Sequence, residues 1–340
     1  MFRPLSLLVL LGISSSLMAA SAPTEEMKKI LDAMKSQGGE SLETLTAQKA
    51  RLQPTPADAI KSLSKQEQTA STTSNIEVSD IQIDGAQGKL SARLYKPKNA
   101  NSLPVVVYFH GGGWVIANND VYDSTPRALS EKTGAIFLAV EYRKAPEHKF
   151  PAAHNDAFAA YQWTLKNAAS FGGDPKRVAV AGESAGGNLA LNVSIRARDT
   201  EVQLPIHQLI IYPVASTDTK SESYLQNKDA RPLNAAMMEW FMQNYLRNKE
   251  DLKDKRINLV NADLNKLPPT TLITAEIDPL RSEGILLAER LKAFGVDVEH
   301  KDFKGVTHEF FGMATMLTEA REAQEFVAKD FKSTLESTKI

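Results

Sequence analysis

The chain has 340 residues, of which 42% are hydrophobic and 24% are charged, and this apolar fraction excludes a mainly disordered protein. Its 40 Lys and Arg residues almost balance its 41 Asp and Glu residues, so no strong net charge favours nucleic acid or an anionic membrane as a partner. The absence of cysteine from the sequence excludes disulfides, thiolate nucleophiles and cysteine-based metal sites.

The first residues have the three parts of a secretory signal peptide. One arginine supplies a positive charge, residues 5–13 form a short apolar run, and small residues stand at 19–22. The apolar run is too short to cross a bilayer as an anchor. We predict that residues 1–22 are a signal peptide cleaved between Ala19 and Pro23, so that the mature protein is secreted or periplasmic without an integral membrane anchor. A buried N-terminal helix is the alternative interpretation.

Residues 23–70 are polar and carry an apolar stripe that is typical of a helix. Met27, Ile30, Leu31 and Met34 follow the i, i+3, i+4, i+7 spacing of one helical face. We therefore expect helices in this segment.

From residue 76 the pattern changes to strands. Residues 76–83 and 90–95 alternate apolar and polar side chains, which predicts an antiparallel pair. Short apolar runs then alternate with helix-forming stretches, which predicts βαβ units and a mostly parallel sheet flanked by helices. These further strands are predicted at 105–109, 135–140, 178–181, 209–212, 271–274 and 298–303, and the helices begin near 124, 153, 185, 280 and 318.

A polar and charged stretch at 215–262 interrupts this alternation and is interpreted as an insertion. It contains a helical piece with the aromatic residues Trp240, Phe241 and Tyr245. Such a stripe packs in a core more often than it binds a substrate, so none of these residues is assigned to a binding site.

A G-x-S-x-G motif at 182–186 places Ser184 between the predicted strand at 178–181 and the helix that begins at Ala185. In the nucleophile elbow of a hydrolase, this strand–turn–helix context gives the serine a strained backbone and an exposed hydroxyl. Small neighbours permit the strain, and the helix N-terminus favours negative charge. We predict that Ser184 is a catalytic nucleophile. A glycine-rich turn with a serine N-cap is the alternative.

The run His-Gly-Gly-Gly-Trp at 110–114 follows the predicted strand at 105–109. Backbone N–H groups aimed at a developing oxyanion lower the barrier of ester hydrolysis, each by about 3–4 kcal/mol. We expect the N–H groups of Gly112, Gly113 and Ala185 to form this oxyanion hole. A mobile loop is the alternative, whereas a phosphate-binding P-loop is excluded because no G-K-[ST] follows.

A serine hydroxyl needs a base to remove its proton. Of the six histidines, His308 follows the last predicted strand and thus lies at the carboxyl edge of the sheet, where the elbow also lies. Asp278 follows the strand at 271–274 at the same edge and is the predicted acid, with Glu276 as the alternative. The chain order Ser184, Asp278, His308 is that of an α/β-hydrolase. This chemistry needs neither a metal nor a cofactor.

Several motifs in one order resemble the hormone-sensitive-lipase-like bacterial esterases of the α/β-hydrolase superfamily. The resemblance covers residues 25–335 and implies Ser184, Asp278 and His308 as catalytic residues, with the oxyanion donors named above. The motifs are HGGGW at 110–114, YRKAPEHKFPAA at 142–153, GGDPKRVAVAGESAGGNLA at 172–190, ITAEIDPLRSEG at 273–284 and GVTHEFF at 305–311.

The resemblance also implies an α/β-hydrolase fold with a helical cap. The expected division is a signal peptide at 1–22, N-terminal cap helices at 23–70, the first part of the hydrolase core at 71–214, a cap insertion at 215–262 and the second part of the core at 263–340. We refer to residues 23–70 and 215–262 together as the cap.

The chain departs from the family pattern at Lys144, Ser282 and Glu309, where Leu, Asp and Gly are usual. We expect Glu309 to raise the pKa of the neighbouring base, His308. We expect Ser282 to loosen the support of the acid loop, the segment after the strand at 271–274 that carries Asp278. Arg143 and Glu147 are expected to brace the oxyanion loop, the segment that contains residues 110–114.

The resemblance implies a serine carboxylesterase that hydrolyses short- to medium-chain acyl esters through an acyl-enzyme intermediate. Alternatives among the enzymes are a deacetylase of acetylated carbohydrates or xenobiotic esters, an amidase and a true lipase. A different class is a non-catalytic small-molecule-binding module on the same fold, which the presence of His308 disfavours. The expected partner is a small-molecule ester, and the oligomeric state stays open, with a homodimer as one alternative.

Overall fold

The computed structural model describes residues 21–66, 75–99 and 101–337, so the predicted signal peptide lies almost entirely outside the described residues. The strands are β1 (Ile76–Gly85), β2 (Gly88–Pro97), β3 (Leu103–Phe109), β4 (Ile136–Val140), β5 (Gly173–Glu183), β6 (Gln208–Ile211), β7 (Thr270–Ile277) and β8 (Val298–Thr307). They form one sheet in the order β1-β2-β4-β3-β5-β6-β7-β8. β2 pairs antiparallel with β1 and β4, and the other pairs are parallel. The predicted antiparallel pair and mostly parallel sheet are confirmed.

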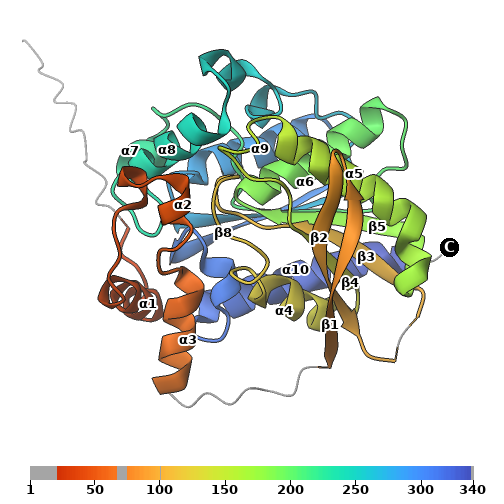
Figure 1. Cartoon of the computed structure of the whole chain (residues 1–340), viewed down its shortest axis with the longest axis horizontal. Helices are drawn as coiled ribbons and strands as arrows, with labels where there is room; N and C mark the ends of the chain where they lie inside the picture. The colour runs from red at the N-terminus through yellow and green to blue at the C-terminus, as the bar shows by residue number, and fades with distance from the viewer. Residues whose placement is uncertain (1–20, 67–74, 100, 338–340) are drawn as a thin grey trace, which may run out of the picture.

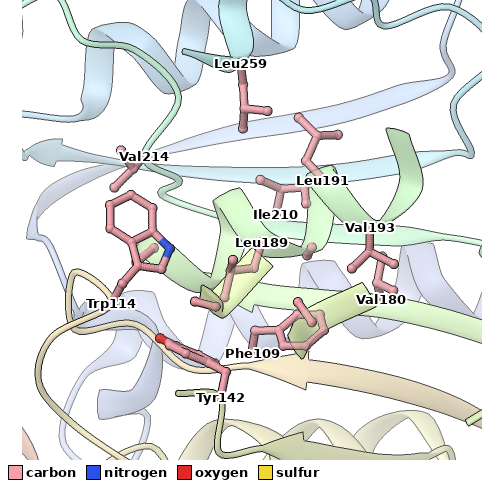
Figure 2. Packing of buried hydrophobic residues seen from close by; sticks show 14 of the residues in the cluster. Phe109, Trp114, Tyr142, Val180, Leu189, Leu191, Val193, Ile210, Val214 and Leu259 are labelled. Atoms are coloured by element: carbon pink, nitrogen blue, oxygen red, sulfur yellow. The ribbon is translucent and has the colours of Figure 1, made fainter. Parts of the chain in front are cut away.

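Helices cover both faces of this sheet (Figure 1). Along β3, Val105 and Val107 belong to the hydrophobic cluster of one face, whereas Val106 and Tyr108 belong to the cluster of the other. Figure 2 shows the first cluster, where Leu189 and its neighbours in α6 pack beside the sheet. The helices beside the sheet are α4 (Ser124–Thr133), α5 (Ala152–Asn167), α6 (Ala185–Asp199), α9 (Arg281–Ala293) and α10 (Thr318–Ser337).

The helices of the cap gather on one side of the molecule (Figure 1). Its two parts touch, because the Trp240 indole N–H donates a hydrogen bond to the Leu45 carbonyl at 3.0 Å. Among the described residues, no helix combines the length and the apolar character that a bilayer crossing requires. The cap helices are α1 (Glu25–Ser36), α2 (Ala47–Ala50), α3 (Pro56–Gln66), α7 (Glu222–Gln226) and α8 (Ala235–Tyr245).

The start of the described chain is fixed to the end of the sheet. Thr24 caps α1, since its hydroxyl accepts from the Met27 N–H, and its own N–H donates to the Gly305 carbonyl in β8 at 2.9 Å. β8 is longer than the predicted strand at 298–303, because the ladder with β7 resumes after a register shift and pairs Ile277 with Thr307. The residue after this pair is His308, so the ladder positions it directly.

Candidate active site

Ser184 lies at the turn between β5 and α6, with φ 56° and ψ −119°. This positive φ is the strained backbone that the elbow motif predicts. A Cβ on Gly186 would lie 2.0 Å from the Phe109 carbonyl oxygen, so only glycine fits at this position. The lack of a side chain there allows the turn to be this tight. The Ser184 N–H donates to the Ile211 carbonyl at 2.9 Å, which fixes the turn against β6.

The structure brings Ser184, His308 and Asp278 into one hydrogen-bonded row. His308 Nε2 lies 2.9 Å from Ser184 Oγ, and His308 Nδ1 lies 2.6 Å from Asp278 Oδ2. The other oxygen of Asp278 accepts from the Leu280 N–H at 2.9 Å, and all three members of the row are buried. Glu276, the alternative acid, instead accepts from the Gly305 N–H at 2.8 Å.

The surroundings of His308 favour its charged form. Burial by itself would lower the pKa of His308, but the charge and hydrogen bond of Asp278, together with the charges of Glu309 and Glu183, raise it above its ordinary value. Glu309 thus acts in the direction expected from the sequence. His110 differs, because burial lowers its pKa to about 4, and its Nδ1 lies 2.7 Å from the Gly111 carbonyl oxygen.

Of the predicted oxyanion donors, Gly112 and Gly113 line the same cavity as Ser184, and Ala185 directly follows it in the chain. Gly112 and Gly113 have φ values of 95° and 58°, and Ala185 is the first residue of α6, where N–H groups have no partner within the helix. Within the described part of the chain, no hydrogen bond uses the N–H groups of Gly112 and Gly113. A Cβ on Gly113 would lie 2.2 Å from the Phe241 ring, so the loop and α8 are in close contact.

The loop that follows these glycines is held by Arg51, which the sequence analysis missed. Its Nε donates to the Val115 carbonyl at 2.8 Å and its Nη2 to the Ala145 carbonyl at 2.7 Å. The same guanidinium forms a bidentate ion pair with Glu147, in which Nη1 lies 2.8 Å from Oε1 and Nη2 lies 2.7 Å from Oε2. This pair lowers the pKa of Glu147 to about 2. Arg51 therefore fastens the N-terminal part of the cap to the oxyanion loop.

The hydrogen bonds of Arg51 refine the expectation for Glu147, and the expectation for Arg143 is wrong. Glu147 does brace the loop, but through Arg51, whereas Arg143 pairs with Asp156 at 2.8 Å and does not contact the loop's carbonyls among the described residues. The buried carboxylate of Asp156 draws Arg143 away, because a buried charge needs a partner.

Ser282 does not loosen the acid loop. Its hydroxyl accepts from the Ser223 N–H at 3.1 Å, and its N–H donates to the Ser223 hydroxyl at 2.9 Å. Ser223 also donates to the Pro279 carbonyl at 2.8 Å, next to Asp278. Ser282, through Ser223, thus joins α7 to the acid loop.

We predict that Arg51→Ala lowers the free energy of unfolding by about 2 kcal/mol, because hydrogen bonds to charged groups contribute about 1.5–3 kcal/mol. Turnover of esters should fall as well, since the loop that carries Gly112 and Gly113 loses its anchor. Thermal unfolding and kcat, measured together, check this. Arg51→Lys keeps the charge but cannot form the bidentate ion pair with Glu147. Its Tm and kcat should therefore lie between those of Arg51→Ala and those of the unchanged protein. Equal Tm values for Arg51→Ala and the unchanged protein would contradict the role.

A cavity of about 820 Å³ opens onto Ser184 and His308. Its walls combine the oxyanion loop, the N-terminal part of the cap and α8, which contributes Met237, Met238 and Phe241. Tyr245 of the same helix packs instead against Trp114, with ring centroids 4.4 Å apart. From the sequence, no α8 residue could be assigned to a binding site, because the spacing of apolar residues does not separate those that line a cavity from those that pack in the core.

Among the residues that the structure describes, no group of three or more His, Asp or Glu side chains could hold a metal ion.

Comparison with known proteins gives one consistent result. A family model described as the alpha/beta hydrolase fold matches residues 106–312. The chain is 38% identical over 253 residues to carboxylesterase NlhH of Mycobacterium tuberculosis, covering 73% of this chain and 79% of the relative. It is 33% identical over 258 residues to ethyl acetate hydrolase of Pseudomonas putida, covering 74% and 81%. A solved hyperthermophilic esterase from Pyrobaculum calidifontis superimposes with a TM-score of 0.84 at 35% identity, covering 92% of this chain and 99% of that one.

Proposed function

The chain belongs to the hormone-sensitive-lipase-like esterases of the α/β-hydrolase family and is a carboxylic ester hydrolase, and on this premise we propose that Ser184, His308 and Asp278 are its catalytic triad. The observation that carries the proposal is the pair of hydrogen bonds from His308, at 2.9 Å to Ser184 and 2.6 Å to Asp278. In a triad, the base must contact both the nucleophile and the acid that orients it.

In this mechanism the Ser184 hydroxyl oxygen attacks the ester carbonyl carbon while His308 Nε2 takes its proton. The oxyanion is stabilised by the N–H groups of Gly112, Gly113 and Ala185. Asp278 keeps the proton on His308 Nδ1 and stabilises the imidazolium. His308 then gives its proton to the leaving alcohol, so that an acyl group remains on Ser184. A water molecule, activated by His308, attacks this acyl-enzyme and releases the acid.

The pH profile of ester hydrolysis tests the base. His308 accepts a proton only when it is neutral, and its pKa is raised above the ordinary value of about 6.5. We therefore expect kcat/KM to be full at alkaline pH and to fall as the pH decreases, with a midpoint above about 6.5. The measurement is the hydrolysis of p-nitrophenyl acetate between pH 5 and 9. A flat profile from pH 5 to 8 would exclude His308 as the base.

For the substrate, we propose esters with short to medium acyl chains. The apolar side chains of Met237, Met238 and Phe241 in the cavity support an acyl group as the occupant. One relative, the ethyl acetate hydrolase of Pseudomonas putida, is named for an ester at the short end of this range, which favours short acyl chains. Rates with p-nitrophenyl esters from C2 to C12 should be highest for the short and medium chains. A maximum at C12 would favour a true lipase instead.

We also propose that the enzyme is exported after removal of residues 1–22. The support is the arginine, the apolar run and the small residues at 19–22 in the sequence. N-terminal sequencing of the protein recovered from the periplasm or the medium should give a first residue between Ala20 and Pro23. Recovery of the protein with Met1 still present would refute the proposal.

A further inference from the structure

Two carboxylates that the proposed mechanism does not use are neighbours, in the chain, of proposed triad residues. Glu183 directly precedes Ser184, and Glu309 directly follows His308. Glu183 is buried, and Glu309 is half-buried where it lines the cavity. Each is therefore fixed by the backbone beside a residue that reacts.

Two tyrosine hydroxyls, one on β3 and one directly after β6, hold Glu183 in place. Tyr108 of β3 donates to Glu183 Oε1 at 2.5 Å, and Tyr212, which follows β6, donates to Glu183 Oε2. The ring of Tyr212 also packs on the imidazole of His308, with centroids 4.6 Å apart. Tyr212 thus lies between the Glu183 carboxylate and the base.

Glu309 is held in a similar way from the loop before α4. The Tyr122 hydroxyl donates to Glu309 Oε1 at 2.5 Å. The backbone of Glu309 has φ 70°, a conformation that residues other than glycine adopt only at a cost. The chain therefore carries a strained backbone at the position that places this carboxylate.

Among the described residues, neither Glu183 nor Glu309 has a Lys or Arg partner at ion-pair distance. Burial, together with the charge of Glu309, raises the pKa of Glu183 to about 7, although the hydrogen bonds from Tyr108 and Tyr212 act against this rise. Burial also raises the pKa of Glu309, whereas His308 and the Tyr122 hydrogen bond act against this. The positive charge that these carboxylates face is therefore the imidazolium that forms on His308 during the reaction.

We propose that Glu309, held by Tyr122 and supported by Glu183, is a positioning residue that stabilises the imidazolium of His308 during ester hydrolysis. The inference rests on the proposed function, because it needs His308 to be the base. Besides the carboxyl group of Glu309 itself, the ionisable groups that face His308 are Asp278 after β7, Glu183 at the end of β5 and Tyr212 after β6, whereas Tyr122 before α4 faces Glu309.

The test is the pH profile of Glu309→Gln with p-nitrophenyl acetate. Glutamine keeps the size of the side chain and can still accept from Tyr122, but it carries no charge. We expect the acid midpoint of kcat/KM to fall by about one pH unit and kcat on the plateau to fall by up to about tenfold, with KM little changed. A merely structural role would not move the midpoint.

Two further variants complete the test. Tyr122→Phe removes the hydrogen bond that stabilises the Glu309 carboxylate, so it should shift the midpoint in the same direction by a smaller amount. Glu131→Gln removes an exposed carboxylate from α4 and is the matched control for net charge, with no expected shift.

An unchanged or higher midpoint in folded Glu309→Gln overturns the inference. If that variant fails to fold, the midpoint of Tyr122→Phe decides in the same way. Failure of the proposed function is a different result, because the unchanged protein would then lack ester turnover or an acid limb altogether.

Discussion

Ser184→Ala is expected to lower the turnover of p-nitrophenyl acetate by a factor on the order of 10⁴ to 10⁶ without unfolding the protein. The substitution removes the atom that forms the acyl-enzyme, and the other members of the triad cannot replace it. Among the described residues, the Ser184 hydroxyl hydrogen-bonds only to His308, so thermal stability should change little. The measurement is kcat for the ester together with the Tm by circular dichroism.

Ser194→Ala is the matched control for this variant. Ser194 is a buried serine of α6, and its hydroxyl has no hydrogen-bond partner among the described residues. Its replacement should leave turnover intact. Ester turnover near the unchanged level in Ser184→Ala would refute the nucleophile, and a folded unchanged protein without any turnover would favour a non-catalytic binding module.

Gly113→Ala is expected to lower kcat by about 100- to 1000-fold, the loss that follows removal of one oxyanion donor. The added Cβ would lie 2.2 Å from the Phe241 ring, and φ at this position is 58°. The loop must therefore shift, and its N–H groups leave the position where the oxyanion develops. The measurement is kcat for p-nitrophenyl acetate on protein whose folding has been checked.

Two variants separate the clash from backbone strain. Gly134 has φ 72° and no atom within 4 Å of the position that a Cβ would take, so Gly134→Ala shares the strain without the clash. It should lower stability but leave kcat unchanged. Adding Phe241→Ala to Gly113→Ala removes the clashing ring and should recover part of kcat. If Gly113→Ala alone retains full activity, the oxyanion assignment is wrong.

The arrangement of the sheet and of the three residues of the proposed triad could be predicted because each rests on a local pattern. The elbow at Ser184 depends on five consecutive residues, and the places of Asp278 and His308 follow from the rule that parallel strands end at one edge. The structure lengthens β8, but this change leaves His308 directly after the strand.

The supports of the site could not be predicted, because they join segments that are far apart in the chain. Arg51 reaches partners that stand 64 to 96 positions later, and Tyr122 reaches Glu309 across 187 positions. The expectation that Arg143 braces the oxyanion loop was wrong, since Arg143 pairs with the buried Asp156, and Glu147 reaches the loop only through Arg51. Charge and motif indicate that such residues need partners, but only the fold determines which ones.

The hydrogen bond from Thr24 to Gly305 has a practical consequence for recombinant production. It joins the beginning of the predicted mature chain to β8, three residues before His308, the proposed base. A purification tag fused directly ahead of Pro23 adds bulk beside this strand, and we expect it to change activity for reasons unrelated to any mutation under study. The tag belongs after α10, which ends on the other side of the molecule from the cap (Figure 1).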